Sequence, residues 1–530
     1  GFGFAGAGAA GAGLVISYGL LTGGSGSAMR AVIMILCLWL AMGAGRTYDT
    51  LSALGLAAVV LLLREPYLIF QSGFQLSFGA VWAIAGPGKW LEEQLELTAG
   101  WQKGAAVSLC VQIVLTPVML WHYFQYPLYG MALNVLILPF VPLLMYSGLL
   151  AIGTGSVNVF LGKAAAGAGH YILMYYDWLC RRAEGPPGYC LVLGKPSWGQ
   201  IAVYGGVMAG ALWCLARGRQ KNVFRGGKQL PGKRYAFLAL AVLLAVFFWS
   251  LSLLGPQPAG GIQALCLDVG QGDCIFIRDR EGKKMLVDGG SSDLSSVGTY
   301  RIEPFLLSQG VRKLEYVFVT HGDADHINGI QELLQNQKQG VEIDALVLPP
   351  EEYMDEKLLH LAEMAKENGT RVLTIYSGEE VGTYLKCIAP LTTRKNERTR
   401  GRMEEVPRLE AGNEASVVLE LKDGAFQMLL TGDLEGRGEE QLVESGTLES
   451  CPILKAGHHG SKNSGSEDFL QIVKPRLTLI SAGIENRYGH PHEETLERLQ
   501  EIGSEVLSTQ ECGAITLRSD GRKIKVHKYL

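Results

Sequence analysis

Residues 314–326 read LEYVFVTHGDADH, an apolar run that turns abruptly into histidines and aspartates. A short run rich in Val, Tyr and Phe predicts a buried β-strand. A loop at the end of such a strand lets His321 and Asp323 converge on one point, while Asp325 and His326 can turn toward a second point. Imidazoles and carboxylates arranged in this way are ligands for two adjacent divalent cations. We therefore expect this segment to supply one side of a two-metal site at the edge of a β-sheet.

Three further segments place the same residue types at the ends of apolar strands. LLTGD ends in Asp433, LKAGHHGS carries His458 and His459, and SAGIENRYGHPH carries His490. An aspartate projected between two cations can bridge them, so Asp433 is predicted to be the shared ligand. One such motif would be weak evidence, but four of them indicate a common site rather than a set of solvated turns.

The segment that contains these motifs, residues 260–530, alternates β-rich runs with helical stretches at 352–368, 436–445 and 493–503. Strands interspersed with helices are typical of sheets that are covered by helices on their outer faces. We predict an α/β domain here, in which helices cover the outer faces of the sheets.

The first part of the chain has few charged residues and suits a lipid environment rather than water. Residues 1–216 hold 16 charged side chains, with none between Lys103 and Lys163, whereas residues 260–530 hold 75. A membrane-spanning helix needs about 20 predominantly apolar residues. We predict eight spans, at 5–22, 31–45, 48–63, 67–86, 104–121, 128–153, 199–216 and 235–254. The chain is therefore predicted to be a polytopic α-helical membrane domain (1–218) followed by the α/β domain.

A basic loop at 219–234 separates the membrane domain from a final transmembrane helix at 235–254. The stretch 217–234 contains seven Lys and Arg residues and no acidic residue. Short basic loops stay in the cytoplasm. The final helix then crosses once more, which predicts that residues 260–530 lie on the extracytoplasmic side of the cell membrane.

Two glutamines in the predicted membrane domain have two possible roles. Gln71 and Gln75 lie about one helical turn apart in the segment QSGFQLSF. Lipid cannot satisfy polar side chains, so these residues either line a polar channel or make hydrogen bonds between helices. The sequence slightly favours the second role.

These motifs, together with LDVGQGD at 267–273 and VDGG at 287–290, resemble the C-terminal domain of ComEC proteins, the bacterial competence proteins that import DNA. That domain is of the metallo-β-lactamase type, in which an αββα sandwich carries metals at one edge. GFQLSF at 73–78 is similar to the competence-domain spans, so the resemblance covers nearly the whole chain. An oligonucleotide-binding-type domain that precedes this region in many relatives has no counterpart here, and the chain begins with Gly1 rather than Met. We therefore expect it to be part of a longer protein.

The resemblance implies a membrane channel for DNA uptake in transformation, with an appended metal-dependent nuclease. One strand of DNA would be transported and the other degraded. The implied partners are DNA, the lipid bilayer and other components of the DNA-uptake machinery, and the oligomeric state stays open.

Carried over position by position, the resemblance implies six metal ligands: His321, Asp323, Asp325, His326, Asp433 and His458. The sequence cannot separate His458 from the adjacent His459, and we favour His458. Asp323 stands where most members have His, and Asn413 stands where a further ligand His normally sits. Because oxygen donors favour Mn²⁺ over Zn²⁺, we expect two divalent ions, with Mn²⁺ favoured and Zn²⁺ as the alternative.

His459 and His490 are the candidate catalytic residues, which would contact the phosphate or protonate the leaving oxygen. The alternative is that they orient the ligands through hydrogen bonds. Residues 260–530 carry 31 basic and 44 acidic side chains, a balance that repels DNA. A basic stretch could contact the DNA backbone or could equally be a solvated loop. It contains Arg394, Lys395, Arg398, Arg400 and Arg402.

Two other functions remain open from the sequence. The first is a membrane-anchored metal-dependent phosphoesterase that acts on a small or envelope substrate, although eight spans exceed what an anchor needs. The second is a transporter whose metal domain binds without catalysis, which the two replaced histidines leave open. We favour the DNA-uptake channel with a metal-dependent phosphodiesterase domain.

Overall fold

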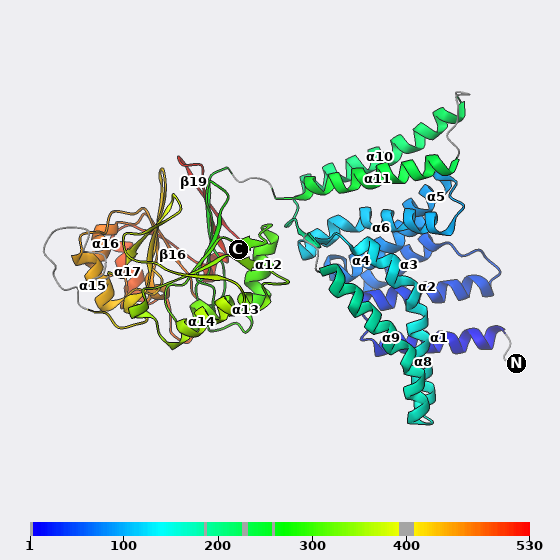
Figure 1. Cartoon of the computed structure of the whole chain (residues 1–530), viewed down its shortest axis with the longest axis horizontal. Helices are drawn as coiled ribbons and strands as arrows, with labels where there is room; N and C mark the ends of the chain where they lie inside the picture. Colours follow the sequence, from blue (N-terminus) through cyan, green and yellow to red (C-terminus); the bar gives the residue numbers. More distant parts are fainter. Residues whose placement is uncertain (1–3, 185–187, 225–231, 257–259, 392–407) are drawn as a thin grey trace. The chain divides into compact units, whose positions relative to one another are not determined.

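The computed structural model describes residues 4–184, 188–224, 232–256, 260–391 and 408–530. The chain divides into two compact units, Gly1–Pro256 and Gln257–Leu530. The first unit is helical and the second contains two large β-sheets (Figure 1). Each unit has a buried apolar core of its own.

Helices and two short strands build the first unit. The α-helices are α1 (Phe4–Leu21), α2 (Gly26–Gly43), α3 (Thr50–Arg64), α4 (Ser72–Ala83), α5 (Lys89–Leu95), α6 (Gly100–Tyr123), α7 (Gly130–Ile137), α8 (Val141–Gly155), α9 (Val159–Glu184), α10 (Trp198–Phe224) and α11 (Gly232–Leu254). Between them lie the 3₁₀ turns η1 (Pro66–Phe70) and η3 (Leu138–Phe140), the π turn η2 (Ile84–Gly88), and the antiparallel strands β1 (Gln125–Pro127) and β2 (Cys190–Val192).

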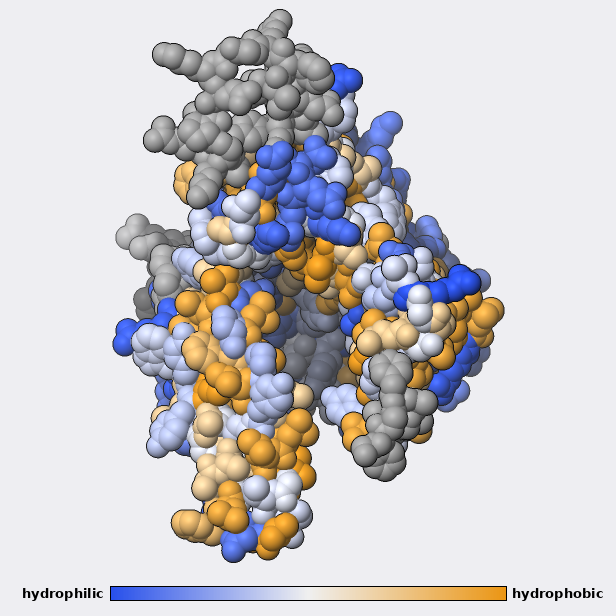
Figure 2. Space-filling view, turned by 90° about the vertical axis from the view of Figure 1, so that its right-hand side faces the viewer, coloured by the Kyte–Doolittle hydropathy of each residue, from blue (hydrophilic) through white to orange (hydrophobic). Residues whose placement is uncertain are grey.

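Several helices of this unit have the length and composition of membrane spans. In the described part of the chain five helical segments qualify: Gly26–Gly43, Gly100–Tyr123, Gly130–Gly155, Trp198–Leu215 and Phe237–Leu254. Gly11–Leu21 and Thr50–Arg64 are apolar but shorter. Large apolar side chains remain exposed along these helices, and Figure 2 shows apolar residues spread over their surface. Such a surface suits lipid rather than water, and the protein is a multi-pass membrane protein.

The predicted span over 67–86 starts before the helix that it covers, and it stays a prediction. Residues 66–70 form η1, which begins at Pro66. Helix α4 continues without a break through the π turn η2, which contains Pro87, into α5, so one helical segment runs from residue 72 to residue 95. Within the described residues this segment is not among those with the composition of a membrane span. Gln71, which directly precedes α4, is exposed.

The polar side chains of α4 are bonded to neighbouring elements. The side-chain amide nitrogen of Gln75 donates to the Ile69 carbonyl at 2.8 Å, and its Oε1 accepts from His122 Nε2 on α6 at 2.9 Å. Arg30 Nε on α2 donates to Ser77 Oγ at 2.7 Å. These bonds tie the short helix to α2 and α6, so the geometry favours the interhelical hydrogen-bonding role for Gln75.

The orientation prediction depends on the loop at 219–234. Helix α10 continues to Phe224 and α11 begins at Gly232, so both ends of the predicted loop are helical, and residues 225–231 lie outside the described residues. The side on which the second unit lies therefore stays a prediction.

The second unit is rich in strands. They are β3 (Ile262–Cys266), β4 (Ile275–Arg278), β5 (Lys284–Val287), β6 (Lys313–Leu314), β7 (Tyr316–Phe318), β8 (Glu342–Ile343), β9 (Ala345–Leu348), β10 (Arg371–Thr374), β11 (Glu380–Val381), β12 (Leu385–Ala389), β13 (Val418–Asp423), β14 (Phe426–Leu430), β15 (Ile453–Lys455), β16 (Leu477–Ile480), β17 (Glu505–Ser508), β18 (Ile515–Ser519) and β19 (Ile524–Lys528). The helices and helical turns are η4 (Gly298–Ile302), α12 (Glu303–Ser308), α13 (Ala324–Asn336), η5 (Glu351–Tyr353), α14 (Glu356–Glu367), η7 (Asn413–Ala415), α15 (Gly436–Glu444), η8 (Gly457–Gly460), α16 (Glu467–Val473), α17 (Glu493–Glu501) and α18 (Thr509–Cys512).

The strands form an eight-stranded sheet, in the order β10-β9-β7-β5-β4-β3-β18-β19, and a seven-stranded sheet, in the order β11-β12-β13-β14-β15-β16-β17. Apolar side chains from both sheets, such as Ile277 and Leu419, meet in one buried cluster. A second apolar cluster, which includes Leu429 and Phe469, joins the other face of the seven-stranded sheet to its helices. Helices α13 and α14 contact strands on the side of the first sheet (Figure 1). The predicted αββα sandwich is confirmed.

Parallel pairing decides where the loops of this domain gather. Strand β5 pairs parallel with β7, and β14, β15 and β16 pair parallel in succession. Neighbouring parallel strands end at the same edge of a sheet. The segments that follow these five strands contain Asp288, His321, Asp433, His459 and His490. The topology therefore brings the predicted metal motifs to one edge of the sandwich.

We expect Gln75→Leu to destabilise the first unit. The substitution leaves the half-buried His122 N–H without its acceptor, which costs about 1 kcal/mol. Thermal unfolding of the purified chain in detergent should shift to lower temperature. The exposed Gln71→Leu is the control, and an equal shift in both variants would contradict the hydrogen-bonding role of Gln75.

Candidate metal centre

The predicted metal motif at 321–326 starts in the loop after β7 and enters the first turn of α13. Asp323 precedes the helix, and Asp325 and His326 lie in its first turn. Two glycine-containing turns hold this turn from behind, because Asp273 N donates to the Asp325 carbonyl at 3.1 Å and Gly289 N donates to the His326 carbonyl at 2.8 Å. The LDVGQGD and VDGG motifs therefore hold the segment 321–326 in place through backbone hydrogen bonds.

Glycine at position 290 is required by this close approach. A Cβ atom there would collide with the backbone of Asp325 and His326. Real Cβ atoms do not approach backbone atoms so closely, so a larger residue would push the first turn of α13 away from the sheet.

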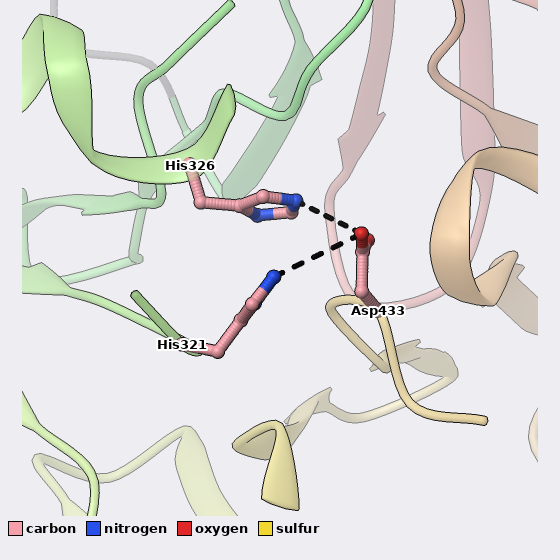
Figure 3. A group of neighbouring side chains, drawn as sticks. All are labelled: His321, His326 and Asp433. Atoms are coloured by element: carbon pink, nitrogen blue, oxygen red, sulfur yellow. Dashed lines mark ion pairs between the residues drawn. The ribbon is translucent and has the colours of Figure 1, made fainter. Parts of the chain in front are cut away.

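The predicted ligands from the two sheets converge on Asp433. Its Oδ2 lies 3.2 Å from His326 Nε2 and 3.9 Å from His321 Nε2 (Figure 3). His459 Nε2 approaches the same oxygen at 3.5 Å and lies 3.6 Å from Asp325 Oδ2. Five side chains that are up to 138 positions apart in the sequence therefore face one small volume.

Hydrogen bonds on the far side of two histidines fix which nitrogen carries the proton. His326 Nδ1 donates to Asp288 Oδ2 at 2.9 Å. His321 Nδ1 lies 3.0 Å from Thr320 Oγ1, whose hydroxyl donates to Asp288 at 2.8 Å and so accepts from the imidazole. With the proton on Nδ1, a neutral imidazole presents a lone pair at Nε2. Both Nε2 lone pairs therefore face Asp433.

His459 is held in the same tautomer. Its Nδ1 donates to the Ser481 carbonyl at 2.9 Å. This leaves the Nε2 lone pair directed at the carboxylates of Asp325 and Asp433. Metal-binding histidines are oriented by outer hydrogen bonds of this kind.

Several inward-facing atoms have no hydrogen-bond partner. Within the described residues the buried atoms without a partner at this site are Nε2 of His321, His326 and His459, Oδ1 of Asp433 and Oδ1 of Asp273. Acceptor atoms that face one another out of water repel unless a cation lies between them. The imidazole and carboxylate donors present suit divalent cations. The residues therefore fit the metal that the fold implies.

The described residues form four overlapping groups of potential ligands whose donor atoms lie within 4.8 Å of one another. The groups are His321, His326 and Asp433; Asp325, His326 and His459; Asp273, Asp433 and His459; and Asp273, Asp288 and His326. The first two groups share His326, whose free Nε2 can bind one cation, while His321 belongs to the first group and His459 to the second.

The concentration of carboxylates shifts the pKa values of the histidines. Burial alone lowers the pKa of His326, but Asp433 and Asp288 outweigh it and raise the pKa well above its usual value. Burial likewise opposes the effect of Asp433 at His459, whose pKa is raised to about 9. Burial raises the pKa of Asp433, yet the histidines hold it well below its usual range. The site therefore attracts positive charge, and a bound cation would take the place of these protons.

The sequence favoured His458 over His459 as the ligand, whereas the geometry favours His459. Both residues have left-handed backbone, with φ of 44° and 53°, which turns consecutive side chains in different directions. His458 Nδ1 is bonded to Glu435 Oε2 at 2.7 Å, and its Nε2 lies 3.8 Å from Asp433 Oδ2. His459 belongs to two of the groups formed by the described residues, and His458 to none of them.

The two positions that depart from the family pattern have other partners. Asp323 Oδ2 lies 3.6 Å from His321 Nε2, but its Oδ1 accepts from Lys357 Nζ at 2.9 Å. The Asn413 side chain donates to Glu435 Oε1 at 3.1 Å. Asp323 therefore lies at the rim of the site, and Asn413 supports the carboxylate that holds His458.

His490 lies beside the site as a neutral donor. The amide of Gln271 accepts from Gly483 N at 3.2 Å, so its nitrogen faces His490 Nδ1 at 3.3 Å and donates to it. The imidazole proton is then on Nε2. Burial together with His458 and His459 lowers the pKa of His490 to about 4. At neutral pH this side chain can donate a hydrogen bond but does not carry a positive charge.

A buried ion pair lies behind His459, and we did not predict it. Lys455 Nζ is 2.7 Å from Asp273 Oδ2, with side-chain exposures of 0% and 1%. Burial raises the pKa of Asp273, but Lys455 outweighs burial and holds this pKa below its usual range. The signal was present in the sequence as a single lysine inside an apolar strand next to the histidine motif. The supporting residues Glu435 and Gln271 carry no comparable signal.

The predicted nucleic-acid contacts at Arg394, Lys395, Arg398, Arg400 and Arg402 lie outside the described residues. They stay predictions, with the solvated loop as the alternative.

Comparison with known proteins finds matches along both units. Residues 5–218 match the family described as Competence protein, and residues 267–484 match the Metallo-beta-lactamase superfamily. ComE operon protein 3 of Bacillus subtilis (strain 168) is 27% identical over 95% of this chain, and Competence protein ComA of Neisseria gonorrhoeae is 29% identical over 96%. The chain spans 63% and 64% of the lengths of these two relatives.

Among solved structures, the metallo-beta-lactamase fold protein YhfI from Bacillus subtilis is similar to the second unit in fold. The two share 12% identity with a TM-score of 0.31, over 49% of this chain and 100% of that chain.

We expect Lys455→Met to lower the free energy of unfolding of the second unit by about 3–5 kcal/mol, because the buried Asp273 charge loses its partner. Urea unfolding followed by pulse proteolysis of the purified chain measures this. The deficit should shrink below about pH 4, where Asp273 takes up a proton on unfolding and the stability from its lowered pKa is lost. The double variant Lys455→Met/Asp273→Asn should be less destabilised than the two single variants combined, and full additivity would contradict the pairing.

We expect His459→Ala to lower the bound metal, because Nε2 of His459 faces two of the carboxylates. His458→Ala should keep the metal content of the wild type. Mass spectrometry of the purified chain after loading with Mn²⁺ or Zn²⁺ and desalting gives the number of ions per chain. The reverse result would restore His458 as the ligand.

Proposed function

Because the chain joins a competence-protein domain to a metallo-β-lactamase domain, we propose that it is a channel for DNA uptake whose second unit is a metal-dependent deoxyribonuclease. In this proposal one strand passes through the membrane and the other is degraded. The membrane helices and the hydrolase fold support the two halves of the proposal separately.

One observation carries the hydrolase half. Lone pairs of three histidines and the carboxylates of Asp325 and Asp433 face one another in a buried volume, which suits two divalent cations. When bound, such cations activate water and offset the negative charge that develops on a phosphodiester. Asp433 contributes donors to both sides of the volume, which suits a bridging role.

We propose Mn²⁺ as the ion, with Zn²⁺ as the alternative. The carboxylates of Asp325 and Asp433 face the same volume as the three imidazoles, and carboxylate oxygens suit Mn²⁺ better than they suit Zn²⁺.

The residues around the volume have distinct proposed roles. His490 donates a hydrogen bond from Nε2 to a phosphate oxygen, and the Gln271 amide keeps the proton on that nitrogen. His458, held by Glu435 at 2.7 Å, contacts the phosphate from the other side of the loop. Asp288 and Ser481 orient the ligand histidines and do not touch the substrate.

The membrane half of the proposal follows the resemblance to competence proteins. The second unit lies on the extracytoplasmic side, where incoming DNA arrives, and other components of the uptake machinery supply the energy. The hydrogen bonds between α2, α4 and α6 satisfy polar side chains of this domain within the protein, which a lipid environment requires.

Cleavage of linear DNA tests the function. The purified chain in detergent should degrade end-labelled DNA with Mn²⁺ and lose this activity with EDTA. Asp433→Ala should lower the rate by about 100-fold or more, because the shared ligand of both ions is lost. Asp468→Ala, on the exposed start of α16, is the control.

Two results would contradict the proposal. Hydrolysis of bis(p-nitrophenyl) phosphate without cleavage of DNA would favour a phosphoesterase for small substrates. No hydrolysis of either compound with Mn²⁺ or Zn²⁺ would favour a domain that binds metal without catalysis.

A further inference from the structure

A basic hairpin lies at one edge of the acidic second unit. Strands β18 and β19 and the turn between them contain Arg518, Arg522, Lys523, Lys525 and Lys528, with Asp520 as the one acidic residue of this segment. Residues 260–530 as a whole carry 44 acidic and 31 basic side chains. The basic hairpin, residues 515–528, therefore has a sign of charge opposite to that of its domain.

The side chains of this hairpin are accessible. Strand β19 is the last strand of the eight-stranded sheet, so one of its edges is unpaired. All five basic residues are exposed. The unpaired edge also offers backbone N–H groups, which are donors for an anion.

Within the described part of the chain, the basic side chains of the hairpin are not held in ion pairs, although the charge of Arg522 acts on the Asp520 carboxylate. Basic residues close to it in the fold are paired, since Arg280 bonds to Asp423 at 2.9 Å and Lys283 to Glu281 at 2.9 Å. Among the described residues, no ion pair joins any of the five hairpin residues to a carboxylate within 4.0 Å. Asp520 accepts from the backbone N–H groups of Arg522 and Lys523.

The positive charge continues across the sheet. Arg518 is directly opposite Lys525 on one side and Gln263 on the other, and Gln263 is opposite Arg278. Directly opposite residues share a face, and neighbouring strands are about 4.8 Å apart. Burial lowers the pKa of Arg278, and the nearby Arg518 lowers it further. The outer face of this corner therefore concentrates like charges, which is unfavourable without an anion.

The hairpin runs toward the metal-centre end of the sheet. Lys528 is opposite Ile515, which in turn is opposite Cys266 at the end of β3. The loop after β3 contains Asp273, whose backbone N–H donates to the carbonyl of Asp325 at the metal centre. The turn residue Arg522 lies at the other end, about 20 Å away at the rise of a β-strand. A strand of DNA that occupies the metal centre could continue along this length with several of its phosphates.

We propose that the basic hairpin binds the phosphodiester backbone of the DNA strand that is cut at the metal centre. The proposal rests on the proposed function and names the surface that holds the substrate outside the centre. Phosphate groups complement the unpaired lysines, and such binding needs no particular base sequence. The competing role of edge lysines is to prevent two sheets from pairing through their edges, and the experiment separates the two roles.

Binding is measured first in the absence of catalysis. Fluorescence anisotropy of a labelled single-stranded oligonucleotide, with the full chain in detergent and EDTA, gives the affinity as a function of salt. Lys525→Gln/Lys528→Gln should weaken binding about 10-fold at low salt and lower the slope of log K against log salt by about 1.4. The matched control is Lys366→Gln/Lys386→Gln, which removes the same charge from exposed positions on α14 and β12.

The second experiment measures whether the hairpin contributes to DNA cleavage at the metal centre. With Mn²⁺, the hairpin variant should show a KM for the oligonucleotide that is about 10-fold higher than that of the wild type. Its hydrolysis of bis(p-nitrophenyl) phosphate should be unchanged, because this small diester is too short to contact the metal centre and the hairpin at once. Unchanged DNA binding, or equal weakening in the control variant, would overturn the proposal. Normal binding together with aggregation of the hairpin variant would assign the lysines to edge protection. If the wild type binds DNA through the hairpin but cuts neither DNA nor the small diester, the proposed function fails and the binding surface stands.

Discussion

The second unit depends on one electrostatic constraint, the meeting of acceptor atoms around Asp433. Lone pairs of His321, His326 and His459 point at its carboxylate, and these groups repel one another unless protons or cations lie between them. The fold holds them in place from behind, through Asp288 for two histidines and the Ser481 carbonyl for the third. This buried arrangement therefore requires protons or bound cations between the acceptor atoms.

The same constraint accounts for costly features elsewhere in the domain. The left-handed backbone at His458 and His459 costs on the order of 1–3 kcal/mol for each residue, and it separates the two side chains so that one faces the carboxylates and the other faces Glu435. The buried Lys455 offsets one of the charges that would otherwise add to the repulsion. These features lie within a few residues of the candidate ligands and are compensated by the apolar core between the sheets.

Both sheets and the site motifs were predictable from sequence, because their signals are local. Alternating apolar residues indicate strands, and a histidine or aspartate directly after a strand must lie at its end. Apolar composition indicates the membrane helices but does not fix their ends, since the helix that contains Gln75 begins at Ser72 and continues past Pro87 to Leu95. Which of His458 and His459 faces the carboxylates was also beyond the sequence, because adjacent residues share every local signal.

The sequence alone determined that an apolar membrane unit is joined to an acidic α/β unit with His and Asp residues at its strand ends. Only the tertiary structure decided which side chains face one another, because convergence depends on strand order and on backbone dihedral angles that composition does not encode. It also decided that Asp273 and Lys455 form a buried pair and that the last hairpin lies at an open edge. These facts arise from contacts between segments far apart in the chain, where pairing of strands, rather than local preference, sets the distances.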